Sequence, residues 1–154
     1  MQNHVEFVKT VICSKEMAVK YLREHNLLDD PEEAVVNCEK CGSVMQNKRR
    51  LIRGARVPVM RCPRKGCQAM TSVRHGNSFF HYRDLNNKMN CKQSLCQILD
   101  IVYFFPCETP INYAETVTGR SHSTLVDWYN MCWEICTKVI ERKRQMLGTT
   151  EESI

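Results

Sequence analysis

The sequence predicts a small α+β protein in which a zinc ribbon of short antiparallel strands precedes a three-helix helix-turn-helix bundle. Two close cysteine pairs lie in the first half of the chain, and glycine and proline separate short β-prone pieces around them. The second half instead carries apolar residues at helical spacing. Within the 154 residues we expect an N-terminal helical arm (1–33), the zinc ribbon (34–84), the helix-turn-helix domain (88–146) and a disordered tail (147–154).

The N-terminal arm contains one predicted helix. Ser14 can cap it, because a serine hydroxyl accepts a hydrogen bond from the unpaired N–H groups of a first helical turn. The helix continues to about Glu24, where Asn26 and the Asp29-Asp30-Pro31 cluster end it. Its expected inward side consists of Met17, Ala18, Tyr21 and Leu22.

Two cysteine pairs, Cys38-Glu-Lys-Cys41 and Cys62-Pro-Arg-Lys-Gly-Cys67, flank a loop of 20 residues. This is the spacing of a four-thiolate zinc site, in which each pair spans a tight knuckle. Gly42 and Gly66 lie where such knuckles need a positive φ. We therefore expect Zn²⁺ to bind here and to supply folding energy, which is on the order of 10–16 kcal/mol in isolated finger peptides.

The ten cysteines of the chain could also indicate disulfides or free thiols. The N-terminus lacks the pattern of a secretory signal, and no stretch approaches the roughly 18 apolar residues of a membrane span. We therefore expect an intracellular protein, nuclear if the source is eukaryotic, in which paired cysteines hold metal. His75 or His81 could replace one cysteine as a ligand. The other thiols are expected to be ordinary core residues: Cys13, Cys91, Cys96, Cys107, Cys132 and Cys136.

The predicted ribbon is strongly basic. From Gly42 to Arg83 the chain has ten basic residues and no acidic one. Such a surface attracts polyanions, and arginine can bind phosphate oxygens through two hydrogen bonds. A solvated basic surface without a partner is the alternative. The candidate DNA contacts in this window are Lys48, Arg49, Arg50, Arg53, Arg56, Arg64 and Lys65. The expected strands are Val44–Gln46, Val57–Arg61, Ala69–Val73 and Ser78–His81.

A first helix of the second half is expected to open at Asn90, with Gln93 completing a capping box, and to stop at Pro106. Its expected buried stripe is Leu95, Ile98, Leu99 and Val102. Thr109-Pro110 then signals a short helix, with the threonine as the capping hydroxyl. Gly119 ends this second helix, whose inward residues are expected to be Ile111, Ala114 and Val117.

Ser121 is expected to cap a third and longer helix that runs into the basic residues 142–144, whose charge suits a helix C-terminus. Its apolar positions are Leu125, Tyr129, Cys132, Ile135 or Cys136, and Val139. Residues 110–130 thus have the make-up of a helix-turn-helix, which places its second helix in the DNA major groove. Phosphate contacts are expected from Arg120, Ser121 and Thr124, and base contacts from His122 and Ser123. A purely structural bundle is the alternative, and Asp127 fits a groove-reading helix only if it accepts from a cytosine amine.

These features together resemble the N-terminal half of Merlin-superfamily DNA transposases and their bacterial insertion-sequence relatives. The likeness is carried in order by the helix at 17–24, Cys38-x-x-Cys41-Gly-Ser, Arg61-Cys62-Pro with Cys67, residues 72–80 (SVRHGNSFF), the helix at 95–105, and the helix-turn-helix ending Val126-Asp-Trp-Tyr129. The resemblance implies DNA binding through the zinc ribbon and helix-turn-helix. In that family a ribonuclease-H-like domain follows, whose acidic residues hold two divalent metals.

The chain ends at residues 148–154, about where the family's first catalytic strand would begin, so we expect no strand-transfer activity. The acids Glu108, Glu115, Asp127, Glu134 and Glu141 fall on or between predicted helices and have no sheet to converge on. The predicted function is a zinc-dependent DNA-binding protein, a truncated or domesticated transposase N-terminal region. Its expected partner is double-stranded DNA, either a transposon-end-like or a host site, with a homodimer as a further hypothesis and no membrane.

The alternative is a protein-interaction or dimerisation module built on the ribbon and the long helix, which would leave Tyr129, Trp133 and Met146 partly exposed. An enzyme with a cysteine nucleophile is the least favoured reading. No local signature pairs a thiol with His75, His81 or His122.

Overall fold

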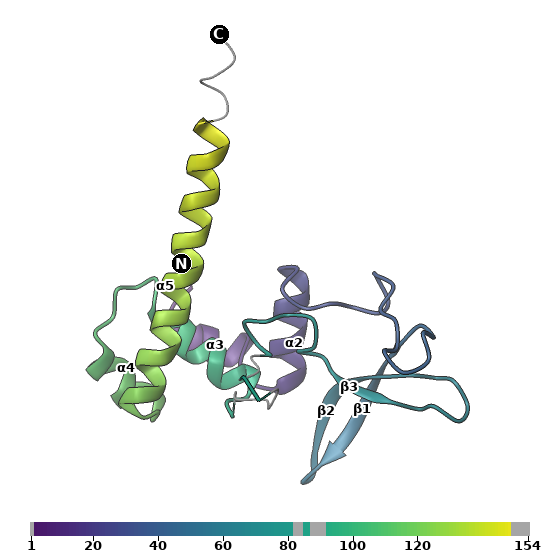
Figure 1. The fold of residues 1–154 in the computed structure, drawn as a ribbon. Coiled ribbons are helices and arrows are strands. Elements are labelled where there is room, and N and C mark those ends of the chain that lie inside the picture. The colour runs from purple at the N-terminus through teal and green to yellow at the C-terminus, as the bar shows by residue number, and fades with distance from the viewer. Residues whose placement is uncertain (1, 82–84, 87–91, 149–154) are drawn as a thin grey trace. The chain divides into compact units, whose positions relative to one another are not determined.

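A computed structural model describes residues 2–81, 85–86 and 92–148 of the chain. In this part the protein has a small α+β fold with five helices and one three-stranded antiparallel sheet, which confirms the α+β part of the prediction (Figure 1). The chain divides into two compact units, residues 1–97 and 98–154, and each is described by itself. No helix of the described part is long and apolar enough to cross a bilayer.

Two helices begin the first unit, α1 (His4–Thr10) and α2 (Lys15–Glu24). The α2 helix starts as predicted, with the Ser14 hydroxyl accepting from the Met17 N–H at 3.2 Å. Residues Ala18, Val19 and Leu22 of α2 are buried, whereas Met17, expected on the inward side, is 37% exposed. Helix α1 is too short to show a clear apolar period, and the sequence did not indicate it.

The sheet consists of β1 (Gln46–Ile52), β2 (Ala55–Arg61) and β3 (Met70–Ser72), in that spatial order. The β1–β2 hairpin turns on Arg53 and Gly54, whose φ angles of 48° and 77° match the two left-handed positions of a type I′ turn. The β2 strand includes the whole predicted strand 57–61 and starts two residues earlier. The β3 strand lies inside the predicted strand 69–73. The predicted strand 44–46 supplies only its last residue to β1, while Val44 forms an isolated bridge with Asn37.

The predicted strand Ser78–His81 is wrong, because these residues form turns. Asn77 organises this segment with its backbone and its side chain. Its carbonyl oxygen accepts from the N–H groups of Phe80 and His81 at 3.2 and 2.9 Å. Its side-chain oxygen accepts from the Phe79 N–H at 2.9 Å. An asparagine side chain that bonds the backbone two residues on stabilises a turn in preference to a strand.

A polar clamp holds α2 against the β-hairpin. Arg23 donates from Nη2 to Oδ1 of Asn47 at 2.9 Å and from Nε to the carbonyl oxygen of Asp29 at 3.0 Å. Asn47 in turn donates to Oδ1 of Asp30 at 2.8 Å. Partial burial alone would raise the pKa of Asp30, but the Glu32 N–H, Asn47 and the Arg23 charge together lower it. The ionised Asp30 carboxylate therefore helps to hold the hairpin with one face turned toward α2. This is the face that carries the buried Met60.

Helix α3 (Leu95–Phe104) begins later than predicted. Its capping box is Ser94 with Gln97: Gln97 N–H donates to the serine hydroxyl at 3.2 Å, and Ser94 N–H donates to Oε1 of Gln97 at 3.0 Å. The expected start at Asn90 is corrected by this box, and Asn90 itself lies outside the described residues. The Ser94–Gln97 box pairs two backbone N–H groups at the start of the helix, directly before the first buried residues of α3.

Helix α4 (Ile111–Thr118) follows a turn and ends, as predicted, at Gly119 with a left-handed φ of 66°. Thr109 does not cap it: Pro110 occupies the N-cap without a side-chain bond, and the Thr109 carbonyl oxygen accepts from the Tyr129 hydroxyl at 3.3 Å. Of the residues expected to point inward, Ala114 is fully buried but Val117 is 40% exposed.

Helix α5 (His122–Gly148) begins at the predicted cap, where Thr124 N–H donates to the Ser121 hydroxyl at 3.3 Å. Its first three turns pack into the core of the second unit through Leu125, Trp128 and Cys132. Beyond Cys132 the expected inward positions are not buried, since Ile135 and Val139 are each 44% exposed. The remaining core residues of this unit are Ile98, Leu99, Ile101, Phe104 and Ala114.

Candidate metal centre and basic surfaces

The first cysteine knuckle is a tight backbone turn between Asn37 and Val44. Cys38 N–H donates to the Ser43 carbonyl oxygen, and Gly42 N–H donates to the Cys38 carbonyl oxygen, each at 2.8 Å. Gly42 has a φ of 73°, as the spacing predicted, and Cys41 precedes it directly. These bonds turn the chain back on itself within six residues, so that both cysteine side chains leave the same side of the turn.

The second knuckle follows β2 without a gap. Cys62 N–H donates to the Ala69 carbonyl oxygen at 2.8 Å, and Cys67 N–H donates to the Arg64 carbonyl oxygen at 3.1 Å. Gly66 takes the predicted positive φ, at 93°, and Gln68 at 45° completes the reversal into β3. The hairpin therefore brings the end of β2 back beside the first knuckle.

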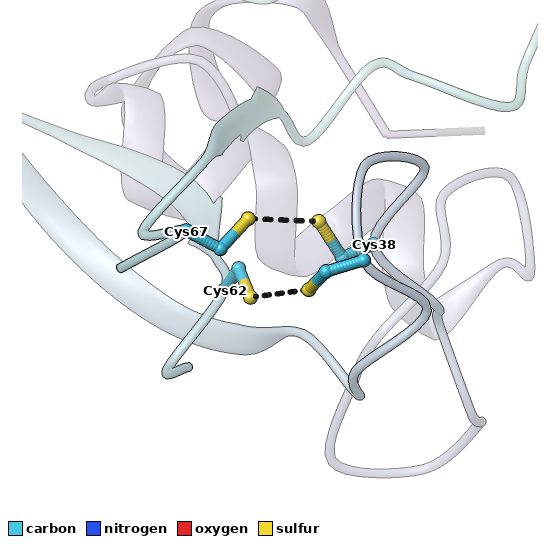
Figure 2. Close-up of side chains that lie close together, drawn as sticks. Cys38, Cys62 and Cys67 are labelled. Atoms are coloured by element: carbon cyan, nitrogen blue, oxygen red, sulfur yellow. Dashed lines mark hydrogen bonds between the residues drawn. The ribbon is translucent and has the colours of Figure 1, made fainter. Parts of the chain in front are cut away.

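The four sulfur atoms lie together, and each close pair joins one knuckle to the other (Figure 2). The Sγ atoms of Cys38 and Cys67 are 3.8 Å apart, and those of Cys41 and Cys62 are 3.4 Å apart. All four lie within 4.8 Å of one another. A tetrahedral zinc ion with Zn–S bonds of about 2.3 Å requires sulfur atoms about 3.8 Å apart. The cluster could therefore bind one metal ion such as zinc with little rearrangement.

The surroundings of the sulfurs differ between the two knuckles. The Ser43 hydroxyl, 3.4 Å from the Cys41 sulfur, and the Ser43 N–H stabilise the thiolate and lower the pKa of Cys41 to about 6. Burial instead raises the pKa of Cys62 to about 12. Cys38 and Cys62 are the buried members of the cluster, and the other two are partly exposed. A positive ion in the cluster would compensate for the cost of burying these thiolates.

Neither histidine near the knuckles belongs to the cluster, which within the described ranges is the only group of His, Cys, Asp or Glu placed to hold a metal. His75 Nε2 lies 3.0 Å from Oε1 of Glu39, a residue of the first knuckle. Its ring also contacts that of His81, with centroids 5.5 Å apart. His75 thus tethers the first knuckle to the turn after β3.

The hairpin divides its basic residues between two faces, because side chains alternate along a strand and cross-strand partners share a face. Arg49 and Arg56 lie on the same face as Asn47 and Met60, the face turned toward α2. Arg49 forms a 2.8 Å ion pair with Glu16 of that helix. Lys48 and Arg50 lie on the opposite face, which we call the outer face, across from Val59 and Val57. Arg61 shares the outer face and donates to Oε1 of Gln68 at 2.6 Å.

The other basic residues of the window have distinct positions. Arg53 sits at the tip of the hairpin, and Arg64 and Lys65 are exposed on the second knuckle. Arg74 has a structural role, because it donates to the carbonyl oxygens of Phe80 and Gln93 at 2.6 and 2.7 Å. Counting charges along the sequence therefore overestimates the cations available to a partner.

A hollow of about 860 Å³ lies between α2, the loop at 30–33 and the hairpin. Its lining mixes both signs of charge: the glutamates 16, 24, 32 and 33 border it together with Lys20, Arg49 and Lys48, which also belongs to the outer face. Sequence reasoning gave no sign of this hollow or of the Arg23–Asn47–Asp30 clamp beside it. Both depend on contacts between residues 17 to 24 positions apart, which no local pattern records.

The predicted DNA-contacting residues of the second unit gather at the start of α5. Gly119, Arg120 and Ser121 form the turn between α4 and α5. The Ser121 hydroxyl lies 2.8 Å from that of Thr124 and 3.2 Å from that of Ser123, so these groups also serve the cap. His122 Nδ1 lies 3.3 Å from Oε2 of Glu115, and its side chain is 60% exposed.

Comparisons of the chain with protein-family models, with curated proteins and with solved structures find no match. The resemblance to Merlin-superfamily transposases therefore stays a hypothesis based on the sequence.

Proposed function

We propose that this protein binds double-stranded DNA and needs zinc to do so, and that it is a transposase-derived binding protein without strand-transfer activity. The observation that carries the proposal is the four-sulfur cluster at the base of the β-hairpin. The cluster joins the two knuckles, and the hairpin between them displays Lys48 and Arg50 on its outer face. A bound ion would hold these cations in a fixed arrangement.

The chemistry of the outer face suits a nucleic acid. Lys48 and Arg50 are exposed, and the chain contains no acidic residue between Gly42 and His81, although Lys48 also borders the hollow that glutamates line. A two-stranded β-ribbon fits the major groove of B-DNA, where lysine and arginine reach phosphates and guanine edges. Arg53, Arg64 and Lys65 extend the positive charge to the tip and the second knuckle.

The start of α5 supplies a second surface of the same kind in the other unit. A helix N-terminus favours phosphate because its N–H groups and dipole point toward the ligand. Ser121, His122 and Ser123 are exposed there, after the short turn that separates α4 from α5. This is the position from which a helix-turn-helix contacts base edges.

Binding of the zinc-loaded protein to a DNA duplex, followed by fluorescence anisotropy over a range of salt concentrations, tests the proposal. If about five phosphates are neutralised, log K should fall against log salt with a slope of roughly −4 to −5. The double variant Lys48→Glu/Arg50→Glu should bind at least about tenfold more weakly and reduce the slope by about 2. The matched control Lys9→Glu/Lys15→Glu makes the same change in net charge on exposed residues of α1 and α2.

Arg49 is left out of the test pair because its ion pair with Glu16 would confound the result. An affinity insensitive to salt would refute the proposal. Equal losses in the test and control variants would refute the assignment of the outer face.

A further inference from the structure

The part of α5 beyond Cys132 carries an exposed apolar stripe. Four residues, which we call the distal stripe, are exposed by 62%, 44%, 44% and 51%: Trp133, Ile135, Val139 and Ile140. At 3.6 residues per turn they fall within an arc of about 160° around the helix axis. Leu125, Trp128 and Cys132, which are buried in the first turns, lie within the same arc. The apolar side of α5 therefore continues past the core of its own unit.

The cost of this exposure is high for a segment of this length. The residues of α5 from Trp133 to Gly148 form about four helical turns (Figure 1). Helices in proteins gain most of their stability from packing an apolar side, so helical turns whose apolar side faces water are only weakly stabilised. A partner that covers the distal stripe would thus bury apolar surface and at the same time stabilise this part of α5.

The charges around the distal stripe indicate what kind of partner fits. Lys143 lies at the centre of the arc, and Arg142 and Arg144 lie about 20° beyond its two edges. The acidic residues Glu134 and Glu141 lie on the opposite side of the helix, about 160–180° from the centre of the arc. The distal stripe is therefore bordered by positive charge alone.

This arrangement disfavours two other occupants. A second copy of the chain in a parallel helix pair would bring Arg142 and Arg144 against the same cations, and like charges that flank a helical seam repel. A membrane surface would place Lys143 at the deepest point of the inserted side, where a charged group is costly. An acidic helix would instead place carboxylates opposite all three cations.

We propose that the distal stripe is a docking surface for an amphipathic helix of another protein, one whose apolar seam is flanked by aspartate or glutamate. Such a helix packs its seam on Val139 and Ile140 and pairs its flanking carboxylates with Arg142 and Arg144, and one further carboxylate lies opposite Lys143. Helix pairing of this type reads positions three, four and seven residues apart, and in the distal stripe Ile135 and Val139 are four residues apart while Trp133 and Ile140 are seven apart.

The test uses the full zinc-loaded chain and two designed helical peptides that share one apolar seam, one flanked by glutamates and the other by lysines. Isothermal titration calorimetry should show the glutamate peptide binding at least about tenfold more tightly than the lysine peptide. Ile140→Asp should weaken the glutamate peptide by about tenfold or more. The matched control is Thr137→Asp, which adds the same charge on the polar side of α5, outside the arc.

Ile140 is half exposed, so its replacement removes no core contact, and circular dichroism checks that α5 persists. A reversed peptide preference in Lys143→Glu would support the charge pairing. Equal binding of both peptides, or no binding up to about 1 mM, would overturn the proposal. So would sedimentation showing a dimer that Ile140→Asp dissociates, or anionic vesicles competing more strongly than the glutamate peptide.

Discussion

Replacing one cysteine of the cluster should unfold the knuckles and the hairpin of the first unit and leave the second unit folded. The variant Cys38→Ser removes one of the four thiolates of a tetrahedral site. A bound ion could then no longer join Cys38 of the first knuckle to Cys67 of the second. A structural zinc contributes on the order of 10 kcal/mol, which is comparable with the whole stability of a small domain. Its loss should therefore open the knuckles and the hairpin instead of merely loosening them.

The backbone bonds named above identify where this should be seen. The N–H groups of Cys38, Gly42 and Cys62, each held at 2.8 Å, should exchange with solvent at least about 100-fold faster in the variant. The amides of residues 98–132 should keep their protection, because their core contains no residue of the cluster. Hydrogen exchange with mass spectrometry measures both regions in one experiment, and elemental analysis gives the zinc content.

Cys13→Ser is the matched control, since Cys13 is an exposed thiol of the same unit outside the cluster. Uniform exchange across both units, or no change in residues 38–72, would refute the reasoning. A zinc-free wild-type preparation with full protection between the knuckles would refute it independently.

Three further predictions concern the remaining features. Replacing His122 and Ser123 with alanine should flatten sequence preference in a binding-site selection while weak non-specific affinity persists, because these side chains leave the exposed start of α5. Zinc affinity in a chelator competition should fall as the pH falls, because protons compete for the thiolates, and the fall should steepen below the Cys41 pKa of about 6. Asn47→Ala should destabilise the protein by about 1–3 kcal/mol in urea unfolding, because it breaks the clamp to α2, whereas the exposed Gln46→Ala should change stability little.

Local signals in the sequence were enough to place the cysteine knuckles and several helix ends. The caps at Ser14 and Ser121 and the left-handed Gly119 each depend on a few neighbouring residues, and all three are observed. The same rule failed at Asn90, because two capping-box patterns, 90–93 and 94–97, follow each other directly and only the one at Ser94 lies next to the buried face of α3.

The β1 strand was missed for a different reason. Its sequence QNKRRLI is polar over five positions, so it has no alternation of apolar residues to reveal a strand. The strand exists because it pairs with β2 through a type I′ turn, for which Arg53-Gly54 is an unusual sequence. Without that register, sequence alone could not show that Lys48 and Arg50 share a face while Arg49 points the other way. The internal use of Arg74 was hidden for the same reason, since its acceptors are backbone oxygens up to 19 residues away.

The clamp from α2 to the hairpin has a practical consequence for any attempt to isolate the metal-binding region. A fragment starting at residue 34 would discard Arg23 and Asp30 and would leave Asn47 and Met60 facing water. A minimal metal-binding peptide of this protein should therefore begin no later than Ser14. Chimeras that transplant the hairpin into another scaffold should carry α2 with it.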